Sequence, residues 1–135
     1  MHSQPLICVA DVEQSSAWFQ RSLGFVSAHG GPEYEQLESD GALVLQLHHW
    51  DAHEHPHLGN PESKPYGNGV ALWFTCEHVE RSYEHAVQAG AEVLEPVHVN
   101  LLANHLEFWL REPNGYVVVV AGRYGQLGSL GQSVA

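Results

Sequence analysis

A four-residue motif occurs twice in this chain, each time at the same point of a similar local pattern. Val-Glu-Gln-Ser at residues 12–15 returns as Val-Glu-Arg-Ser at residues 79–82. Each copy follows a short apolar run, at 5–9 and at 70–74, and opens a stretch whose apolar residues have helical spacing. A repeat of this size predicts two related supersecondary units rather than one irregular domain.

Periodicity and turn residues predict the same order of elements in both units. The first unit is predicted to contain a strand at 4–10, a helix at 12–22 and strands at 25–30, 34–39 and 42–49. The second is predicted to contain a strand at 69–75, a helix at 79–89 and strands at 91–98, 104–110 and 116–122. This order predicts an α+β protein of tandem βαβββ modules. We expect one domain over 1–122 (module one 4–49, linker 50–68, module two 69–122) and a flexible C-terminal tail at 123–135.

Charge excludes several classes of partner. The 135 residues include 16 acidic and 5 basic side chains, for a formal net charge of −11. Such a field repels phosphate backbones and anionic lipid, so neither a nucleic acid nor a membrane partner is expected. The N-terminus lacks the charged and apolar regions of a signal peptide, which predicts a cytoplasmic location. Cys8 and Cys76 have no metal-site or redox spacing and are expected to be reduced packing thiols.

The βαβββ repeat, the Leu-Gly-Phe at 23–25 and the late Glu-Pro-Asn-Gly turn at 112–115 together resemble the vicinal oxygen chelate superfamily. This group contains glyoxalases, bleomycin-resistance proteins and extradiol dioxygenases. The resemblance covers nearly all of residues 4–122, and it implies that the two modules form one cup-shaped mixed sheet. It does not fix the function, because the superfamily holds metalloenzymes, thiol transferases and metal-free binding proteins.

The family's metal places can be carried over to this sequence. In its metalloenzymes the ligands come from the first and last strands of each module, and by resemblance these places fall on Gln4, Gln46 (Leu45 if the register differs by one), Ala71 and Val119. Alanine and valine cannot coordinate, whereas a divalent ion needs three or four N, S or O ligands. No cofactor is therefore expected. The alternative is a zinc, nickel or iron ion held by a shifted ligand set: His2, Gln4, His48, His105 and Glu107.

Side chains alternate in direction along a strand, so one known face assigns the rest. If Ala71 faces the cup, Trp73 does too. In the strand at 104–110, apolar Leu106, Phe108 and Leu110 belong to the helix side, which leaves the intervening residues facing the cup. The predicted ligand-binding residues are Trp73, Trp109, Glu107, His105, Gln46, His48 and Gln4.

This inner face is aromatic and mildly polar. A tryptophan face attracts a cation or stacks on a planar ring, and Glu107 could pair with a cationic group. The favoured hypothesis is a metal-free small-molecule-binding protein that resembles the bleomycin-resistance branch and sequesters a planar or cationic ligand, as a homodimer by resemblance. The alternative is an enzyme, a metal-dependent lyase or dioxygenase with the shifted ligand set. The His-rich segment 48–57 is interpreted as a solvated loop that could form a lip over the cup.

Overall fold

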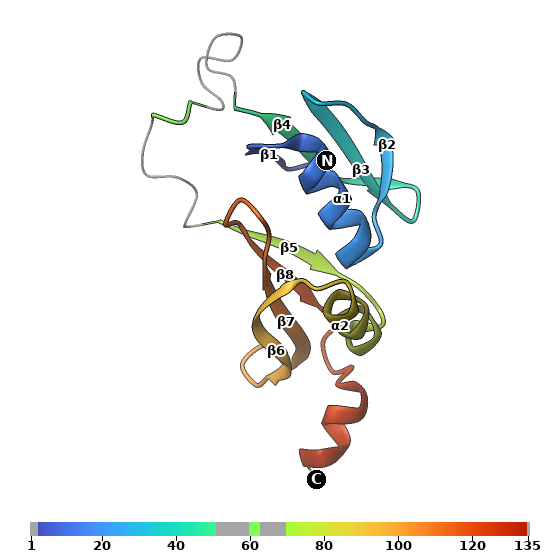
Figure 1. The fold of residues 1–135 in the computed structure, drawn as a ribbon. Coiled ribbons are helices and arrows are strands. Elements are labelled where there is room, and N and C mark those ends of the chain that lie inside the picture. Colours follow the sequence, from blue (N-terminus) through green and yellow to red (C-terminus); the bar gives the residue numbers. More distant parts are fainter. Residues whose placement is uncertain (1–2, 51–59, 63–69, 135) are drawn as a thin grey trace. The chain divides into compact units, whose positions relative to one another are not determined.

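The computed structural model describes residues 3–50, 60–62 and 70–134, and it divides into two compact units, 1–66 and 67–135 (Figure 1). Each unit carries one α-helix and one four-stranded sheet. Unit one contains β1 (Leu6–Val9), α1 (Val12–Leu23), β2 (Val26–His29), β3 (Tyr34–Ser39) and β4 (Ala42–His49). Unit two contains β5 (Ala71–Thr75), α2 (Val79–Gln88), β6 (Glu92–Asn100), β7 (His105–Arg111), β8 (Val117–Ala121) and a 3₁₀ helix, η1 (Gly128–Val134).

The two sheets have the same topology. Their strand orders are β1-β4-β3-β2 and β5-β8-β7-β6. In each sheet the first and last strands of the unit pair in parallel and the other pairs are antiparallel. The tandem βαβββ architecture predicted from the repeat is therefore confirmed, as an α+β fold. The single cup that the two sheets are expected to share stays a prediction.

The register makes positions in the two units equivalent. Leu6 on β1 pairs with Gln46 on β4, and Trp73 on β5 pairs with Val119 on β8. Leu6 and Trp73 each lie at the same distance before the Val-Glu-x-Ser motif. Gln46 is therefore the counterpart of Val119, and the alternative register through Leu45 is wrong.

Local sequence explains both helices. The Asp11 side chain accepts a hydrogen bond of 3.0 Å from the Gln14 N–H, which caps the start of α1. Gly24 ends this helix in the left-handed region, with φ of 74°, where glycine has no Cβ to clash. At the start of α2, His78 makes no side-chain cap. The two helices thus begin where the motif predicts, with different quality of capping.

Each helix covers one face of its own sheet. In unit one the Ser16 side chain on α1 bonds to Glu35, and Leu37 on the same face of β3 is fully buried. In unit two Tyr83 on α2 contacts the ring of buried Phe108, with 5.3 Å between centroids. In β4 the set of alternate residues that includes Gln46, and in β7 the set that includes Glu107, consequently lie on the sheet faces opposite the helices, as strand parity predicts.

Three further sequence predictions concern the tail, the cysteines and the membrane. In the segment predicted as a flexible tail, the backbone N–H of Ser129 donates to Glu80 Oε1 at 2.8 Å, which connects η1 to α2. Its flexibility stays a prediction. Neither Cys8 nor Cys76 forms a disulfide. Among the described residues, no helix is long and apolar enough to cross a membrane.

Candidate functional site

Two tryptophans lie on the face of the β5–β8 sheet opposite α2. Trp73 on β5 and Trp109 on β7 both pair with Val119 on the intervening strand. Their ring centroids are 6.4 Å apart and their planes meet at 83°. Trp73 is 46% exposed, and its ring also lies 5.9 Å from that of His105. Because the tryptophans are nearly perpendicular, a flat ligand can stack on the exposed ring of Trp73 but not between two parallel faces.

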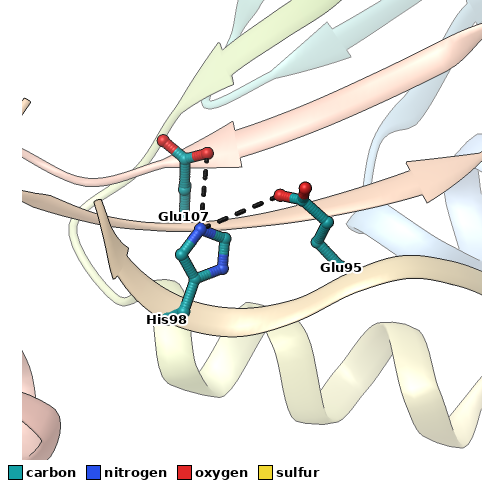
Figure 2. A group of neighbouring side chains, drawn as sticks. All are labelled: Glu95, His98 and Glu107. Atoms are coloured by element: carbon teal, nitrogen blue, oxygen red, sulfur yellow. Dashed lines mark ion pairs between the residues drawn. The ribbon is translucent and has the colours of Figure 1, made fainter. Parts of the chain in front are cut away.

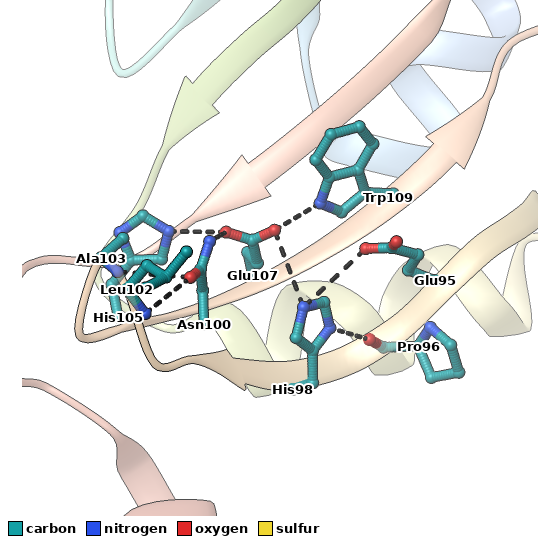
Figure 3. A network of polar contacts seen from close by, with 9 residues as sticks. All are labelled: Glu95, Pro96, His98, Asn100, Leu102, Ala103, His105, Glu107 and Trp109. Carbon is teal, nitrogen blue, oxygen red and sulfur yellow. Dashed lines mark hydrogen bonds and ion pairs between the residues drawn. The ribbon is translucent and has the colours of Figure 1, made fainter.

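A buried carboxylate lies beside this aromatic group. Glu107 is only 2% exposed. Its Oε1 accepts hydrogen bonds from Asn100 Nδ2 at 2.9 Å and His105 Nε2 at 2.7 Å, and its Oε2 accepts one from Trp109 Nε1 (Figure 3). Burial by itself raises the pKa of Glu107, but the three hydrogen bonds and the positive charge that His105 can carry outweigh it, so the pKa is lowered. The group is therefore held as an anion.

The donors around Glu107 cannot reverse their roles. Asn100 Oδ1 accepts from the backbone N–H groups of Leu102 (3.1 Å) and Ala103 (3.2 Å), which leaves its Nδ2 as the donor toward Glu107. The indole N–H of Trp109 can only donate. Both oxygens of Glu107 must consequently be acceptors, a condition that an ionised carboxylate meets and a side-chain amide does not.

An imidazole and a second carboxylate complete the polar group on this face. His98 Nε2 lies 3.7 Å from Glu107 Oε2 and 3.8 Å from Glu95 Oε2 (Figure 2). Its Nδ1 lies 2.7 Å from the carbonyl oxygen of Pro96. The three potential ligand atoms of Glu95, His98 and Glu107 all lie within 4.8 Å of one another, and no other such group occurs in the part of the chain that the structure describes.

Sequence reasoning missed Glu95 and His98. Strand parity places residues 95 and 97 on one face and residue 98 on the other. The β6–β7 register, however, shifts between Val93 and Glu95 and again between Glu95 and His98, around Pro96. The proline inside the strand is the available signal, because a residue without an N–H interrupts the ladder and favours a bulge.

The predicted residues of unit one form a hydrogen-bonded arrangement of their own, built mainly from amides and hydroxyls. Gln46 Oε1 accepts from the Tyr34 hydroxyl at 2.5 Å, and Gln46 Nε2 donates to the backbone carbonyl of Gln4 at 3.0 Å. The Tyr34 hydroxyl in turn accepts from Gln36 Nε2 at 3.0 Å. The ring of His48 lies 6.5 Å from that of Tyr34. These amides and hydroxyls satisfy one another, and Gln4 takes part through its backbone.

The family's metal places do not fit a metal in this chain. Gln46 and Gln4 offer amide groups, but Ala71 and Val119 carry no donor atom at the two places of unit two, and Val119 is fully buried. Half of the ligand set is missing. Of the shifted set proposed from the sequence, the structure brings His105 and Glu107 into contact. His2 and most of the His-rich segment, residues 51–57, lie outside the described residues.

A cavity of about 490 Å³ lies elsewhere in unit two, between the start of α2 and the segment after β8. Its lining includes Glu77, Glu80 and Gly128. Hydrogen bonds from the Ser129 hydroxyl and backbone lower the pKa of Glu80, so this carboxylate serves to hold the C-terminal segment. His78 also lines the cavity, but Trp73, Trp109 and the imidazoles of the sheet face do not, which makes the sheet face the better candidate site.

Comparison with known proteins agrees with the fold. The family model of the Glyoxalase/Bleomycin resistance protein/Dioxygenase superfamily matches residues 3–120. No curated protein matches the chain. Among solved structures, a protein of unknown function from Agrobacterium tumefaciens str. C58 is 17% identical, with a TM-score of 0.72 over 91% of this chain and 94% of that one.

Two further structures have descriptions that name the family. A glyoxalase-related enzyme from Fulvimarina pelagi is 17% identical, with a TM-score of 0.70 over 91% of this chain and 88% of that one. A glyoxalase/bleomycin resistance protein/dioxygenase family enzyme from Burkholderia phytofirmans PsJN is 18% identical, with a TM-score of 0.71 over 88% and 96%. At this identity the likeness is one of fold. With nearly its whole length matched by the family model, the chain belongs to the Glyoxalase/Bleomycin resistance protein/Dioxygenase superfamily.

Proposed function

We propose that this protein binds a planar, cationic small molecule on the β5–β8 sheet face, with Trp73 as the stacking surface. The observation that carries the proposal is the exposure of Trp73, whose ring is 46% accessible although its neighbours Trp109 and His105 are largely covered. A large aromatic side chain that stays open beside a structured polar group is typical of a ligand platform. A cation that lies over a tryptophan ring gains roughly 0.5–2 kcal/mol of binding free energy.

Glu107 contributes to this site indirectly. Because it is buried, it acts on a ligand through its charge and through the rings it orients, Trp109 and His105, rather than through a direct contact. The exposed Glu95 of β6 adds negative charge near the same face, and the net charge of −11 draws cations toward the protein. A cation is therefore favoured over a neutral ligand of the same shape.

Titration of tryptophan fluorescence with a matched pair of probes tests the proposal. N-methylacridinium is a planar cation, and acridine at mildly alkaline pH is the same shape without the charge. We expect N-methylacridinium to quench emission at lower concentration, and Trp73→Leu to weaken its binding by a factor of about 2 to 30. Trp18→Phe, on the helix of unit one, is the control.

Emission that neither probe changes, or unchanged N-methylacridinium binding in Trp73→Leu, would count against binding at this face. Equal affinity for both probes would count against the preference for a cation. The expected homodimer is tested in the same samples by light scattering during size-exclusion chromatography.

The competing function is a metal-dependent lyase or dioxygenase of the same fold. The observation that supports this second function is the group of Glu95, His98 and Glu107, since one imidazole and two carboxylates are suitable metal ligands. Metal analysis of protein purified without a His tag, combined with a turnover assay before and after metal removal, separates the two functions. A stoichiometric metal whose removal abolishes turnover would favour the enzyme.

A further inference from the structure

We propose that Glu95, His98 and Glu107 form a binding site for a divalent transition-metal ion of the zinc type. The site lies on β6 and β7, away from Ala71 and Val119 at the family's metal places. It goes beyond the proposed ligand binding, because it makes Glu95 and His98 metal ligands, a role that stacking on Trp73 does not require. Imidazole nitrogen and carboxylate oxygen are both zinc ligands, and three protein ligands with water in the fourth position is the pattern of open zinc sites.

The orientation of His98 is the first argument. A carbonyl oxygen can only accept, so the 2.7 Å contact with Pro96 requires that Nδ1 carries the proton. In the neutral ring Nε2 then has a free lone pair, and this lone pair faces the two carboxylates (Figure 2). An imidazole whose N–H is held by a backbone carbonyl while its other nitrogen points at acidic groups has the arrangement of a metal ligand.

The spacing of the ligand atoms is the second argument. Nε2 lies 3.8 Å from Glu95 Oε2 and 3.7 Å from Glu107 Oε2, both beyond hydrogen-bond length. The three groups therefore do not satisfy one another directly. A zinc ion about 2.0–2.2 Å from each of its ligands separates neighbouring ligand atoms by roughly 3–4 Å. Small side-chain movements suffice to place the three atoms around one ion.

The environment of the site is the third argument. The carboxylate of Glu107 is buried and fixed by Asn100, His105 and Trp109, so one ligand is already oriented (Figure 3). The side chains of Glu95 and His98 are 53% and 40% exposed, which leaves one side open to ions and water. A fixed inner ligand with two accessible outer ones allows entry of the ion and completion of its shell by solvent.

The simplest competing explanation is an ion pair, in which protonated His98 lies between two carboxylates and no ion binds. A second is that any metal is held by the histidines of segment 48–57. The experiment must therefore distinguish zinc binding at Glu95, His98 and Glu107 from both of these explanations. It uses the full chain without a His tag, and zinc alone as the titrant, in competition with a chromophoric chelator.

We expect wild type to bind one zinc ion tightly and both Glu95→Gln and His98→Gln to weaken binding at least about ten-fold, since even changes to outer-shell groups commonly reach that size. Glu92→Gln is the matched control, because it removes an exposed carboxylate of the same strand that pairs with Arg111. Cobalt substitution adds a spectroscopic test. We expect wild type with bound cobalt to show the visible absorption bands that are typical of a low coordination number, and His98→Gln to lack them.

Zinc binding that is unchanged in His98→Gln and Glu95→Gln, or absent in wild type, would overturn the site. Binding that is lost only when His53, His55 and His57 are all replaced by glutamine would assign the metal to the His-rich segment instead. The same variants are titrated with N-methylacridinium. If His98→Gln loses zinc binding but still binds N-methylacridinium, the metal site is separate from the stacking site. If the stacking proposal fails, the zinc result still stands.

Discussion

In each unit a glutamate on a strand of the sheet is buried, but one lies on the helix side of its sheet and the other on the face away from the helix. Glu35, 3% exposed, lies between the sheet of unit one and α1, where it accepts from the Ser16 hydroxyl at 2.6 Å, from the Ser27 hydroxyl at 2.9 Å and from the Gln36 N–H at 2.9 Å. Glu107, 2% exposed, lies on the face away from α2. The two carboxylates are equally buried, so burial alone does not tell a structural group from a functional one.

The partners make the difference. Hydroxyl groups rotate and can either donate or accept, so the network of Glu35 can rearrange within the core. Asn100 and Trp109 are fixed as donors, and His98 adds an imidazole that is not hydrogen-bonded to Glu107. A carboxylate enclosed by adaptable partners stabilises a helix–sheet contact, whereas one held rigidly beside an imidazole that it does not hydrogen-bond is suited to binding.

Glutamine substitutions at the two positions are the strongest way to break this comparison. Glu107→Gln places an amide against a donor that cannot reverse, and an unsatisfied buried group costs about 1–3 kcal/mol of unfolding free energy. Glu35→Gln keeps an acceptor for the Gln36 N–H and offers its amide to two hydroxyls, so we expect a loss below about 1 kcal/mol. Urea unfolding of both variants measures the difference, and equal losses would remove the distinction.

The two helix caps provide a second contrast. Asp11→Ala removes the side-chain oxygen that accepts the Gln14 N–H, and we expect a loss of about 1 kcal/mol. His78→Ala removes no cap, so its effect should stay within about 0.5 kcal/mol. Thermal unfolding of the two variants tests this, with His78→Asp expected to stabilise the protein. A loss in His78→Ala as large as that in Asp11→Ala would show that the capping difference is not what matters.

Tyr34 occupies in β3 the place that Glu107 has in β7, since Gln36 pairs with Gln46 as Trp109 pairs with Val119. Tyr34→Phe removes a hydroxyl bonded to Gln46 and Gln36, at a cost of about 0.5–1.5 kcal/mol measured by urea unfolding. We expect N-methylacridinium to bind as in wild type. Weakened probe binding would mean that the ligand site includes unit one.

The smallest expected effect concerns pH. Burial raises the pKa of Glu112 and outweighs the hydrogen bonds from Asn114 and Tyr116 that lower it. The folded protein thus holds the Glu112 proton more tightly than the unfolded chain, so this group destabilises the fold above its folded pKa. That effect disappears as the pH falls from the folded pKa toward the ordinary value. The lowered pKa of Glu107 acts with the opposite sign.

Glu112→Gln isolates this effect, because glutamine retains an oxygen for the backbone N–H groups of the turn. Unfolding free energies of the variant and wild type are compared from neutral to mildly acidic pH. The advantage of the variant should be largest at neutral pH and shrink on acidification. A difference independent of pH would contradict a raised pKa for Glu112.

Much of the fold could be predicted from the sequence, because its determinants are local and repeated. The helices and strands begin and end within a few residues of their predicted positions, and parity correctly placed His105, Glu107 and Trp109 on the face of Trp73. The role of these residues in binding a ligand stays a prediction. Strand parity could not predict that Glu95 and His98 lie together, because bulges around Pro96 break the alternation. Nor could it predict that the rings of Trp73 and Trp109 are perpendicular, because side-chain χ angles are set by packing.

The pairing of first and last strands has a consequence for how the chain acquires its structure. In each unit the three later strands are neighbours in sequence and can form a meander, but among the described strands β1 pairs with β4 alone, and β5 with β8 alone. Long-range pairing must first overcome the entropy of loop closure, so we expect the meanders to form early. Synthesis proceeds from the N-terminus, and the apolar first strand of each unit therefore emerges from the ribosome well before its partner does.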